Sequence, residues 1–299
     1  MTLPKFEYFA PRTVEAVLSL LAEKGEGARV MAGGTDLLIR MKHGRIKPQT
    51  IIGLERIEEL KAIRFQPGIG LTIGAMARLA EVASHPDIQK YYPAVAYAAG
   101  ETANVQVRNM GTVAGNLCNA APSADNAPAL MALGAEVALA GPSDERRLPL
   151  DHFFKGPGLT ALAPGEIMTS IVVPCPPAHS GSSYQRLSAR GKVDIAAVCV
   201  GVMAAFDGET CRDVRIVLGA VAPVPLRAIA AEALLKGRTW SPELLSRAGD
   251  QAGKEAKPIS DVRASAAYRV KMVPVLTRRA LAEAQIRAGG NSASGKETR

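Results

Sequence analysis

Aromatic side chains are scarce in this sequence: six Phe, six Tyr and one Trp make up 4% of its 299 residues. Proteins that bind single-stranded nucleic acid stack the bases on aromatic rings, so this scarcity disfavours that class of protein. Apolar residues still make up 47% of the chain, which is ordinary for a globular protein and excludes disorder over the whole length. We therefore expect a core built from aliphatic side chains and alanine.

Long apolar runs are missing as well. The longest uncharged stretch, residues 167–185, contains Pro174, Pro176 and Pro177, so it is not expected to form a membrane-spanning helix. The N-terminal residues contain no apolar segment of the kind found in signal peptides. These absences favour a cytoplasmic location.

Patterns of metal ligands are also lacking. The chain has four cysteines, and no two of them have C-x-x-C spacing; they are Cys118, Cys175, Cys199 and Cys211. In a cytoplasmic protein we expect them to be reduced thiols. The four histidines are far apart in the sequence and form no H-E-x-x-H motif. A zinc site or an iron–sulfur cluster held by this chain alone is therefore not expected.

Motifs of several enzyme classes do not occur. No G-x-x-x-x-G-K-[ST] is present, which disfavours a P-loop kinase or ATPase, and no G-x-S-x-G is present either. Gly68, Gly70 and Gly74 approach the dinucleotide-binding fingerprint, but the last spacing is one residue too long. That segment also lies in a predicted hairpin rather than between a strand and a helix.

The length of the chain predicts roughly two or three domains. The net charge is +8, and the basic excess is spread along the chain. Its densest stretch contains Arg40, Lys42, Arg45 and Lys47 with no acidic residue among them. Such a stretch can face an anionic ligand or an acidic partner, or it can be a solvated helix face, and the sequence leaves both interpretations open.

Residues 1–55 have the pattern of a small βαβ subdomain with a parallel sheet. Thr13 and Gly25 are suited to begin and end its first helix. The expected elements are helices over residues 13–24 and 37–41 and strands over 29–32 and 49–54.

Residues 56–175 are expected to form a mixed α+β subdomain. A hairpin is predicted from two short strands joined by Gln66-Pro67-Gly68. Residues 104–123, rich in Gly, Asn and Pro, are expected to be a long loop. The other expected elements are strands over residues 61–65, 71–75, 136–140 and 167–173 and helices over 77–84, 92–100 and 127–133.

A Pro- and Ser-rich linker over residues 174–183 predicts a boundary, followed by a third domain over residues 177–288. That domain is expected to hold three strands and then three helices, the second of which starts at Ser241-Pro242. The polar residues 289–299 are expected to be a disordered tail.

The first candidate site is the segment around Gly33 and Gly34, between a predicted strand and a predicted helix. The two glycines let backbone N–H groups turn toward one point, and such a nest at the start of a helix suits a phosphate. Thr35 adds a hydroxyl donor, and we expect Asp36 to cap the helix rather than face the anion. The alternative is an ordinary strand–turn–helix corner.

The second candidate site, residues 111–125, is poor in charge and rich in small and hydrogen-bonding side chains. It could let a ligand approach its backbone closely. Ser123 is expected to cap a helix, and Asp125 could accept hydrogen bonds from sugar hydroxyls. The alternative is a long surface loop. Together, two glycine-rich segments that share one diphosphate could hold a dinucleotide without a Rossmann fold, since each charge-assisted hydrogen bond contributes about 1.5–3 kcal/mol.

At these two segments the sequence resembles the FAD-binding medium subunits of the molybdenum hydroxylases, a group that includes xanthine dehydrogenase, carbon monoxide dehydrogenase and 4-hydroxybenzoyl-CoA reductase. The matching motifs are A-G-G-T-D at residues 32–36 and R-N-x-G-T-V-x-G-N-L at residues 108–117, continued by P-S-A-D at residues 122–125. Domain order and length match across nearly the whole chain. The resemblance implies an α+β chain with a two-part PCMH-type FAD-binding fold, a small parallel βαβ subdomain plus a mixed or antiparallel sheet subdomain. A C-terminal three-stranded sheet with a helix bundle would follow and cover the flavin.

The resemblance further implies that FAD lies between the first two subdomains, with its pyrophosphate on the two glycine-rich loops. Asp125 would contact the flavin-side hydroxyls, and Leu162 would pack near the flavin ring. The implied cofactor-binding residues are Val30, Met31, Ala32, Gly33, Gly34, Thr35, Asp36, Thr112, Val113, Ala114, Gly115, Asn116, Asp125, Leu162 and Arg186.

The sequence departs from the family pattern at three points. Arg186 stands where many relatives place a lysine near the isoalloxazine, and because arginine cannot lose its proton, flavin potential and acceptor chemistry are expected to differ. Ala114 stands where many relatives have glycine, which is tolerable only at negative φ. The iron–sulfur insert of the 4-hydroxybenzoyl-CoA reductase subunit is absent, which argues against that chemistry.

The resemblance implies an electron-transfer flavoprotein subunit in which no side chain acts as a catalytic acid or base. A large molybdopterin subunit would oxidise the substrate, and a small subunit with [2Fe–2S] clusters would pass electrons to FAD. FAD would reduce NAD, a quinone or another acceptor. The implied assembly is a heterotrimer, which can pair into a dimer of heterotrimers, with no nucleic-acid partner and no membrane span.

Two alternatives remain open. A stand-alone FAD-dependent NAD(P)H oxidoreductase, similar to the UDP-N-acetylenolpyruvoylglucosamine reductases, would work without partners, but the sequence offers no obvious acid for its substrate. A scaffold subunit without a cofactor would be expected to have lost Gly33 or Gly34, and both are present.

Overall fold

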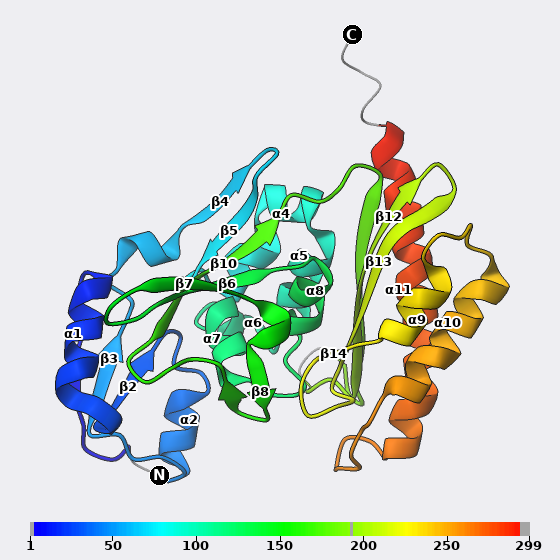
Figure 1. Cartoon of the computed structure of the whole chain (residues 1–299). Helices are drawn as coiled ribbons and strands as arrows, with labels where there is room; N and C mark the ends of the chain where they lie inside the picture. Colours follow the sequence, from blue (N-terminus) through cyan, green and yellow to red (C-terminus); the bar gives the residue numbers. More distant parts are fainter. Residues whose placement is uncertain (1–2, 192–193, 294–299) are drawn as a thin grey trace.

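The computed structural model describes residues 3–191 and 194–293 and contains three main sheets, one after another along the chain (Figure 1). The first is a parallel sheet with strand order β1-β3-β2, in which both outer strands pair with β3. The elements of this part are β1 (Glu7–Phe9), α1 (Val14–Lys24), the 3-10 turn η1 (Gly25–Gly27), β2 (Ala28–Met31), α2 (Leu37–Lys42) and β3 (Thr50–Gly53).

The predicted helix and parallel βαβ pattern of this first part are confirmed. The Thr13 hydroxyl accepts a hydrogen bond from the Ala16 amide at 3.2 Å, and α1 ends at Gly25 with a φ of 56°. Strand β1 was not predicted. It is only three residues long and largely exposed, so it has no apolar alternation to detect.

The second part holds an antiparallel sheet with strand order β4-β5-β10-β6-β7 and a group of short helices. Its strands are β4 (Ile63–Gln66), β5 (Gly70–Gly74), β6 (Glu136–Ala140), β7 (Glu145–Pro149) and β10 (Ile167–Pro174), and β8 (Phe154–Gly156) and β9 (Leu159–Thr160) form a separate pair. Its helices are α3 (Leu79–Ser84), α4 (Pro86–Tyr91), α5 (Pro93–Glu101), α6 (Val105–Arg108), α7 (Val113–Asn119) and α8 (Asn126–Ala132), with 3-10 turns η2 (Glu58–Lys61) and η3 (Leu150–His152).

The expected long loop over residues 104–123 is wrong, because α6 and α7 lie within it. Val113 and Leu117 are four residues apart, so they share one face of α7, and both are fully buried in the core of the second part. The helix was not predicted because Gly and Asn have low helix propensity in isolation. Burial of this apolar pair and the Thr112 cap stabilise it in the folded chain.

The third part is an antiparallel sheet with strand order β11-β12-β13-β14, covered by helices on one face. Figure 1 shows α9, α10 and α11 on that face, and α5 and α8 of the second part on the other. Its elements are β11 (Ser180–Leu187), β12 (Val198–Asp207), β13 (Thr210–Gly219), β14 (Leu226–Arg227), α9 (Ile229–Leu235), α10 (Pro242–Glu255) and α11 (Ala266–Ala293).

Three features of the third part differ from expectation. The sheet has a fourth, two-residue strand, β14, instead of three strands in all. Residues 180–183 belong to β11 and are buried between the second part and α11, so the linker ends earlier than residue 183. The disordered tail was expected to begin at residue 289, and this is wrong for residues 289–293. These residues belong to α11, because a helix that has already formed is easily extended by further residues. Residues 294–299 lie outside the described residues.

The second and third parts are packed closely. A Cβ on Gly201 of β12 would lie 2.3 Å from the backbone oxygen of Pro128 on α8, so only glycine permits this approach. Every helix within residues 3–191 and 194–293 is too short or too polar to cross a bilayer.

Candidate functional site

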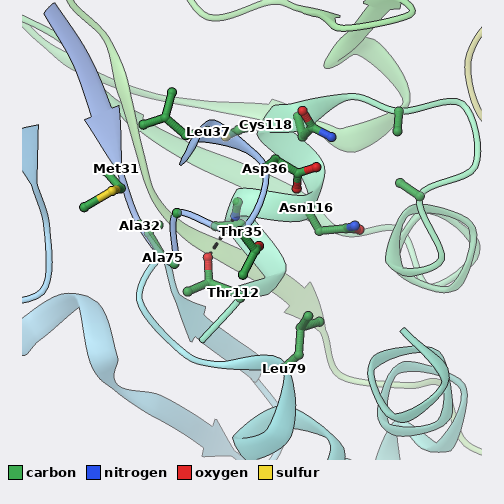
Figure 2. Close-up of a pocket in the computed structure, with 18 of the residues that line it drawn as sticks. Met31, Ala32, Thr35, Asp36, Leu37, Ala75, Leu79, Thr112, Asn116 and Cys118 are labelled. Atoms are coloured by element: carbon green, nitrogen blue, oxygen red, sulfur yellow. Dashed lines mark hydrogen bonds between the residues drawn. The ribbon is translucent and has the colours of Figure 1, made fainter. Parts of the chain in front are cut away.

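A cavity of about 580 Å³ lies where the first and second parts meet (Figure 2). Its volume falls within the range of about 300–1,000 Å³ that is common for cofactor and small-molecule sites. The loop after β2, the start of α7 and the region before α8 all contribute to its lining, and Asp194 and Ile195 of the third part complete it. All three parts therefore meet at one concave site.

The two predicted glycine-rich segments touch each other at this cavity. A Cβ on Gly33 would lie 2.1 Å from the backbone oxygen of Met110 and 2.7 Å from the Cα of Gly111. A Cβ on Gly111 would lie 3.4 Å from the Thr35 hydroxyl oxygen. Gly33 is therefore required for the contact itself, and the two segments are close enough to share one ligand.

The first segment offers unpaired backbone donors. Gly34 has a φ of 71°, a conformation that favours glycine, and it turns the chain between β2 and α2. Among the described residues, the amides at positions 33, 34, 35 and 36 donate to no other group. Backbone amides without partners at the edge of a cavity favour a hydrogen-bond acceptor as ligand.

The second segment is built differently. The Gly115 amide donates to the Thr112 hydroxyl at 2.9 Å (dashed line in Figure 2). The Asn116 amide donates to the Thr112 carbonyl at 3.0 Å. These two amides are therefore engaged within the protein and are not available to a ligand. Ala114 lies inside α7 with negative φ, so alanine is tolerated where many relatives have glycine.

Asp36 does not cap α2, which contradicts the expectation from sequence. A side-chain cap requires an extended backbone, whereas Asp36 has a ψ of −46° and makes no cap hydrogen bond. Its carboxylate lines the cavity instead. Burial raises the pKa of Asp36, and the Arg40 guanidinium opposes that shift.

Asp125 lies at the start of α8 and also lines the cavity. Its Oδ1 accepts hydrogen bonds from the Tyr184 hydroxyl at 2.7 Å and from Arg186 Nε at 2.9 Å. Burial raises the pKa of Asp125, while Arg186 and Tyr184 oppose that shift. The expected cap at Ser123 is wrong, because Asp125 occupies the cap position and makes no side-chain cap bond.

Arg186 is not among the residues that line the cavity. It lies on β11, and its guanidinium also donates to the Ser188 hydroxyl and to the backbone carbonyl of Asp194. Its side chain is 5% exposed and is bonded to Asp125, which does line the cavity. Arg186 therefore joins the third part to Asp125, a role that the resemblance alone did not imply.

Most of the residues implied by the resemblance line this cavity. Val113 does not, because its side chain is in the core of the second part, and Arg186 does not, for the reason just given. Those that do are Val30, Met31, Ala32, Gly33, Gly34, Thr35, Asp36, Thr112, Ala114, Gly115, Asn116, Asp125 and Leu162.

Sequence reasoning missed several lining residues. Arg40 belongs to the basic stretch, which was an available signal, but Arg29, Glu166 and Asp194 come from separate elements with no motif around them. Cys118 lines the cavity too, and burial raises the pKa of its thiol to about 12, which favours the protonated thiol.

Comparison with known proteins gives a consistent result over nearly the whole chain. Residues 4–176 match the family described as the FAD binding domain in molybdopterin dehydrogenase, and residues 183–284 match the CO dehydrogenase flavoprotein C-terminal domain. The carbon monoxide dehydrogenase medium chain of Hydrogenophaga pseudoflava is 35% identical, over 94% of this chain and 97% of its own length. The putative xanthine dehydrogenase FAD-binding subunit XdhB of Escherichia coli K12 is 29% identical, over 95% of this chain and 97% of its own.

Solved structures agree. The structure of carbon monoxide dehydrogenase from Hydrogenophaga pseudoflava that lacks the Mo-pyranopterin moiety matches with a TM-score of 0.92 and 37% identity, over 96% of this chain and 99% of that chain. Quinoline 2-oxidoreductase from Pseudomonas putida 86 matches with a TM-score of 0.89 and 29% identity, over 97% of this chain and 99% of that chain.

Proposed function

Because this chain belongs to the family of FAD-binding medium subunits of the molybdenum hydroxylases, we propose that it binds FAD in the cavity between its two glycine-rich segments and acts in electron transfer. The observation that carries the proposal is the contact of the two segments at Gly33, beside backbone amides that have no partner among the described residues. An acceptor-rich diphosphate is the group that such a site fits.

In this proposal the amides at positions 33–36 donate to the diphosphate from one side, and the Ala114 amide donates from the other. Arg29 and Arg40 also line the cavity and add positive charge for an anionic ligand. Four acidic residues line it too, and three of them, Asp125, Glu166 and Asp194, are paired with arginines. The amides are fixed by the backbone between β2 and α2 and at the start of α7, so they are in place before the ligand arrives.

Asp125 would accept hydrogen bonds from flavin-side hydroxyls through Oδ2, the carboxylate oxygen that Tyr184 and Arg186 do not use. Leu162 and Ile195 would pack against the flavin and exclude water from it. Bound FAD would supply the redox chemistry, because it exchanges electrons singly and in pairs. The residues of this chain bind and orient it.

The proposed partners are a small subunit with [2Fe–2S] clusters and a large molybdopterin subunit, in a heterotrimer that can pair into a dimer. The proposed acceptor is NAD or a quinone, and the proposed location is the cytoplasm. We also propose the division into residues 1–55, 56–175 and 177–288 as two FAD-binding subdomains and a covering domain. The names of the relatives, which are medium chains and FAD-binding subunits, support this assembly.

Titration of the purified chain with FAD tests the proposal. We expect stoichiometric binding, with a flavin spectrum that stays with the protein through gel filtration and is displaced by excess ADP, which carries the diphosphate. A chain that remains colourless would contradict FAD binding. Purification from its native source with iron- and molybdenum-containing partners would support the assembly, whereas NADPH turnover by the isolated chain would favour the stand-alone reductase.

A further inference from the structure

A buried asparagine stands directly behind the α7 side of the cavity. Asn126, the first residue of α8, is 1% exposed and is not itself part of the cavity lining. Its Nδ2 donates to the Thr102 hydroxyl at 3.2 Å and to Asn116 Oδ1 at 3.0 Å. Thr102 and Asn116 both line the cavity, so Asn126 connects two lining residues from behind.

The direction of these hydrogen bonds is set by the Thr102 hydroxyl. The Thr102 hydroxyl donates its one hydrogen to the backbone carbonyl of Ala98 at 2.8 Å, and a carbonyl can only accept. The Thr102 oxygen must therefore accept from Asn126, which requires the amide nitrogen of Asn126 to face it. The same nitrogen is the atom next to Asn116, so Asn116 has to present its oxygen to Asn126.

The amide nitrogen of Asn116 is left with its two hydrogens pointing away from Asn126. It has no acceptor among residues 3–191 and 194–293, and the Asn116 side chain extends from α7 at the cavity (Figure 2). Asn126 Oδ1, in contrast, is buried and has no hydrogen-bond partner in the part of the chain that the structure describes. A buried acceptor without a donor costs stability, so Asn126 is not placed here to stabilise the fold. Its Nδ2 does fix the direction of the Asn116 carboxamide.

We propose that Asn126 is a positioning residue that orients the Asn116 carboxamide so that its NH₂ group donates to an acceptor oxygen of the bound cofactor. This inference rests on the proposed function for the identity of the ligand, but the direction of the amide is a property of the chain alone. The opposite direction would present the oxygen of Asn116 to the cavity, which would repel a phosphoryl or carbonyl oxygen.

A double-mutant cycle on FAD affinity tests this role. Asn116→Ala removes the donor, and we expect the FAD dissociation constant to rise about 10-fold or more. Asn126→Leu keeps the branched heavy-atom skeleton but is bulkier and removes the orienting donor, and we expect a rise of about 3- to 10-fold in the FAD dissociation constant. In the Asn116→Ala background, Asn126→Leu should have no further effect on FAD binding.

Asn119→Ala is the matched control, because Asn119 also lines the cavity but takes no part in this network. Its effect should add to that of Asn126→Leu. If Asn126→Leu weakens FAD binding equally with and without Asn116, Asn126 only supports packing and the proposal is overturned. Should Asn126→Leu not fold, Thr102→Val removes the anchoring hydroxyl without changing the shape, and the same cycle applies to it.

A measurement without FAD separates this inference from the proposed function. In protein labelled with ¹⁵N-asparagine, the side-chain NH₂ signals of Asn126 should be protected from hydrogen exchange and those of Asn116 should exchange rapidly. The reverse pattern overturns the inference whether or not FAD binds. A chain that shows the expected pattern and binds no FAD would overturn the proposed function and support the orientation of Asn116.

Discussion

The two sides of the cavity carry the same kind of glycine-rich sequence but are built by different means. Around Gly33 the backbone makes the wall, and side chains are excluded by the contact with Met110 and Gly111. At α7 and α8 side chains make the wall: Thr112 caps a helix, Asn126 holds Asn116, and Arg186 and Tyr184 hold Asp125. Glycine content alone therefore does not reveal which groups a site presents to its ligand.

The largest effect is expected on the side-chain wall, from Arg186→Leu. Both side chains of the Arg186–Asp125 pair are nearly inaccessible, at 5% and 10% exposure, so this substitution leaves a buried carboxylate whose remaining side-chain partner among the described residues is Tyr184. We expect the free energy of unfolding to fall by about 3–5 kcal/mol at neutral pH. Urea denaturation would measure it.

This loss should depend on pH. Burial raises the pKa of Asp125 in the folded protein, and removal of Arg186 removes a group that opposes the shift. The protonated form is then favoured by folding, so the variant should recover stability in acid and lose it as pH rises through the titration of Asp125. Arg190→Leu is the control, because Arg190 is 83% exposed in its pair with Asp194 and should cost at most about 1 kcal/mol. Equal losses in both variants would show that the buried pair does not hold the wall.

The next effect is expected on the backbone wall, from Gly33→Ala. The new Cβ would meet backbone atoms at 2.1 and 2.7 Å, which cannot move as a flexible side chain could. We expect a loss of about 1–3 kcal/mol in unfolding free energy and a large loss of FAD affinity, since the two segments must separate. Denaturation and FAD titration would measure the two effects.

Gly100→Ala is the matched control for Gly33→Ala. Gly100 lies in α5, and a Cβ there would meet only Ala83 at 3.7 Å, which is ordinary contact. Alanine should stabilise that helix slightly and leave FAD binding unchanged. Unchanged FAD affinity in Gly33→Ala would mean that the contact of the two segments does not form the binding site.

The smallest effect is expected from Thr112→Val, which removes the α7 cap without changing the shape of the side chain. The Gly115 amide would lose its partner, and we expect a loss of about 1 kcal/mol in unfolding free energy. Thr112→Ser keeps the hydroxyl and should retain most of that stability. If valine and serine behave alike in thermal denaturation, the side-chain cap is not what supports this wall.

Elements with local signals were predictable. Thr13 begins α1 and Gly25 ends it, through contacts within a few residues of the chain. The hairpin of β4 and β5 follows from the Gln66-Pro67-Gly68 turn. Strand β1 and helix α7 were missed because their stability comes from distant partners: β1 pairs with β3, some forty residues away, and α7 packs into the core of the second part.

The candidate site shows the same division. The residues of the two glycine-rich segments could be predicted to meet, because their composition and the family motifs point to one ligand, and thirteen of the fifteen implied residues do line the cavity. The position of Arg186 could not be predicted, because its carboxylate partner is 61 residues away and its register on β11 decides which way the side chain reaches.

The amino-acid sequence by itself determined where glycines allow tight turns, where the main helices and strands begin, and which family the chain resembles. Only the tertiary structure decided which amides stay without partners, why Gly33 admits no side chain, and which atom of Asn116 faces the cavity. The physical reason is that turns and caps depend on neighbours along the chain, whereas the direction of a buried hydrogen bond depends on partners that only folding brings together.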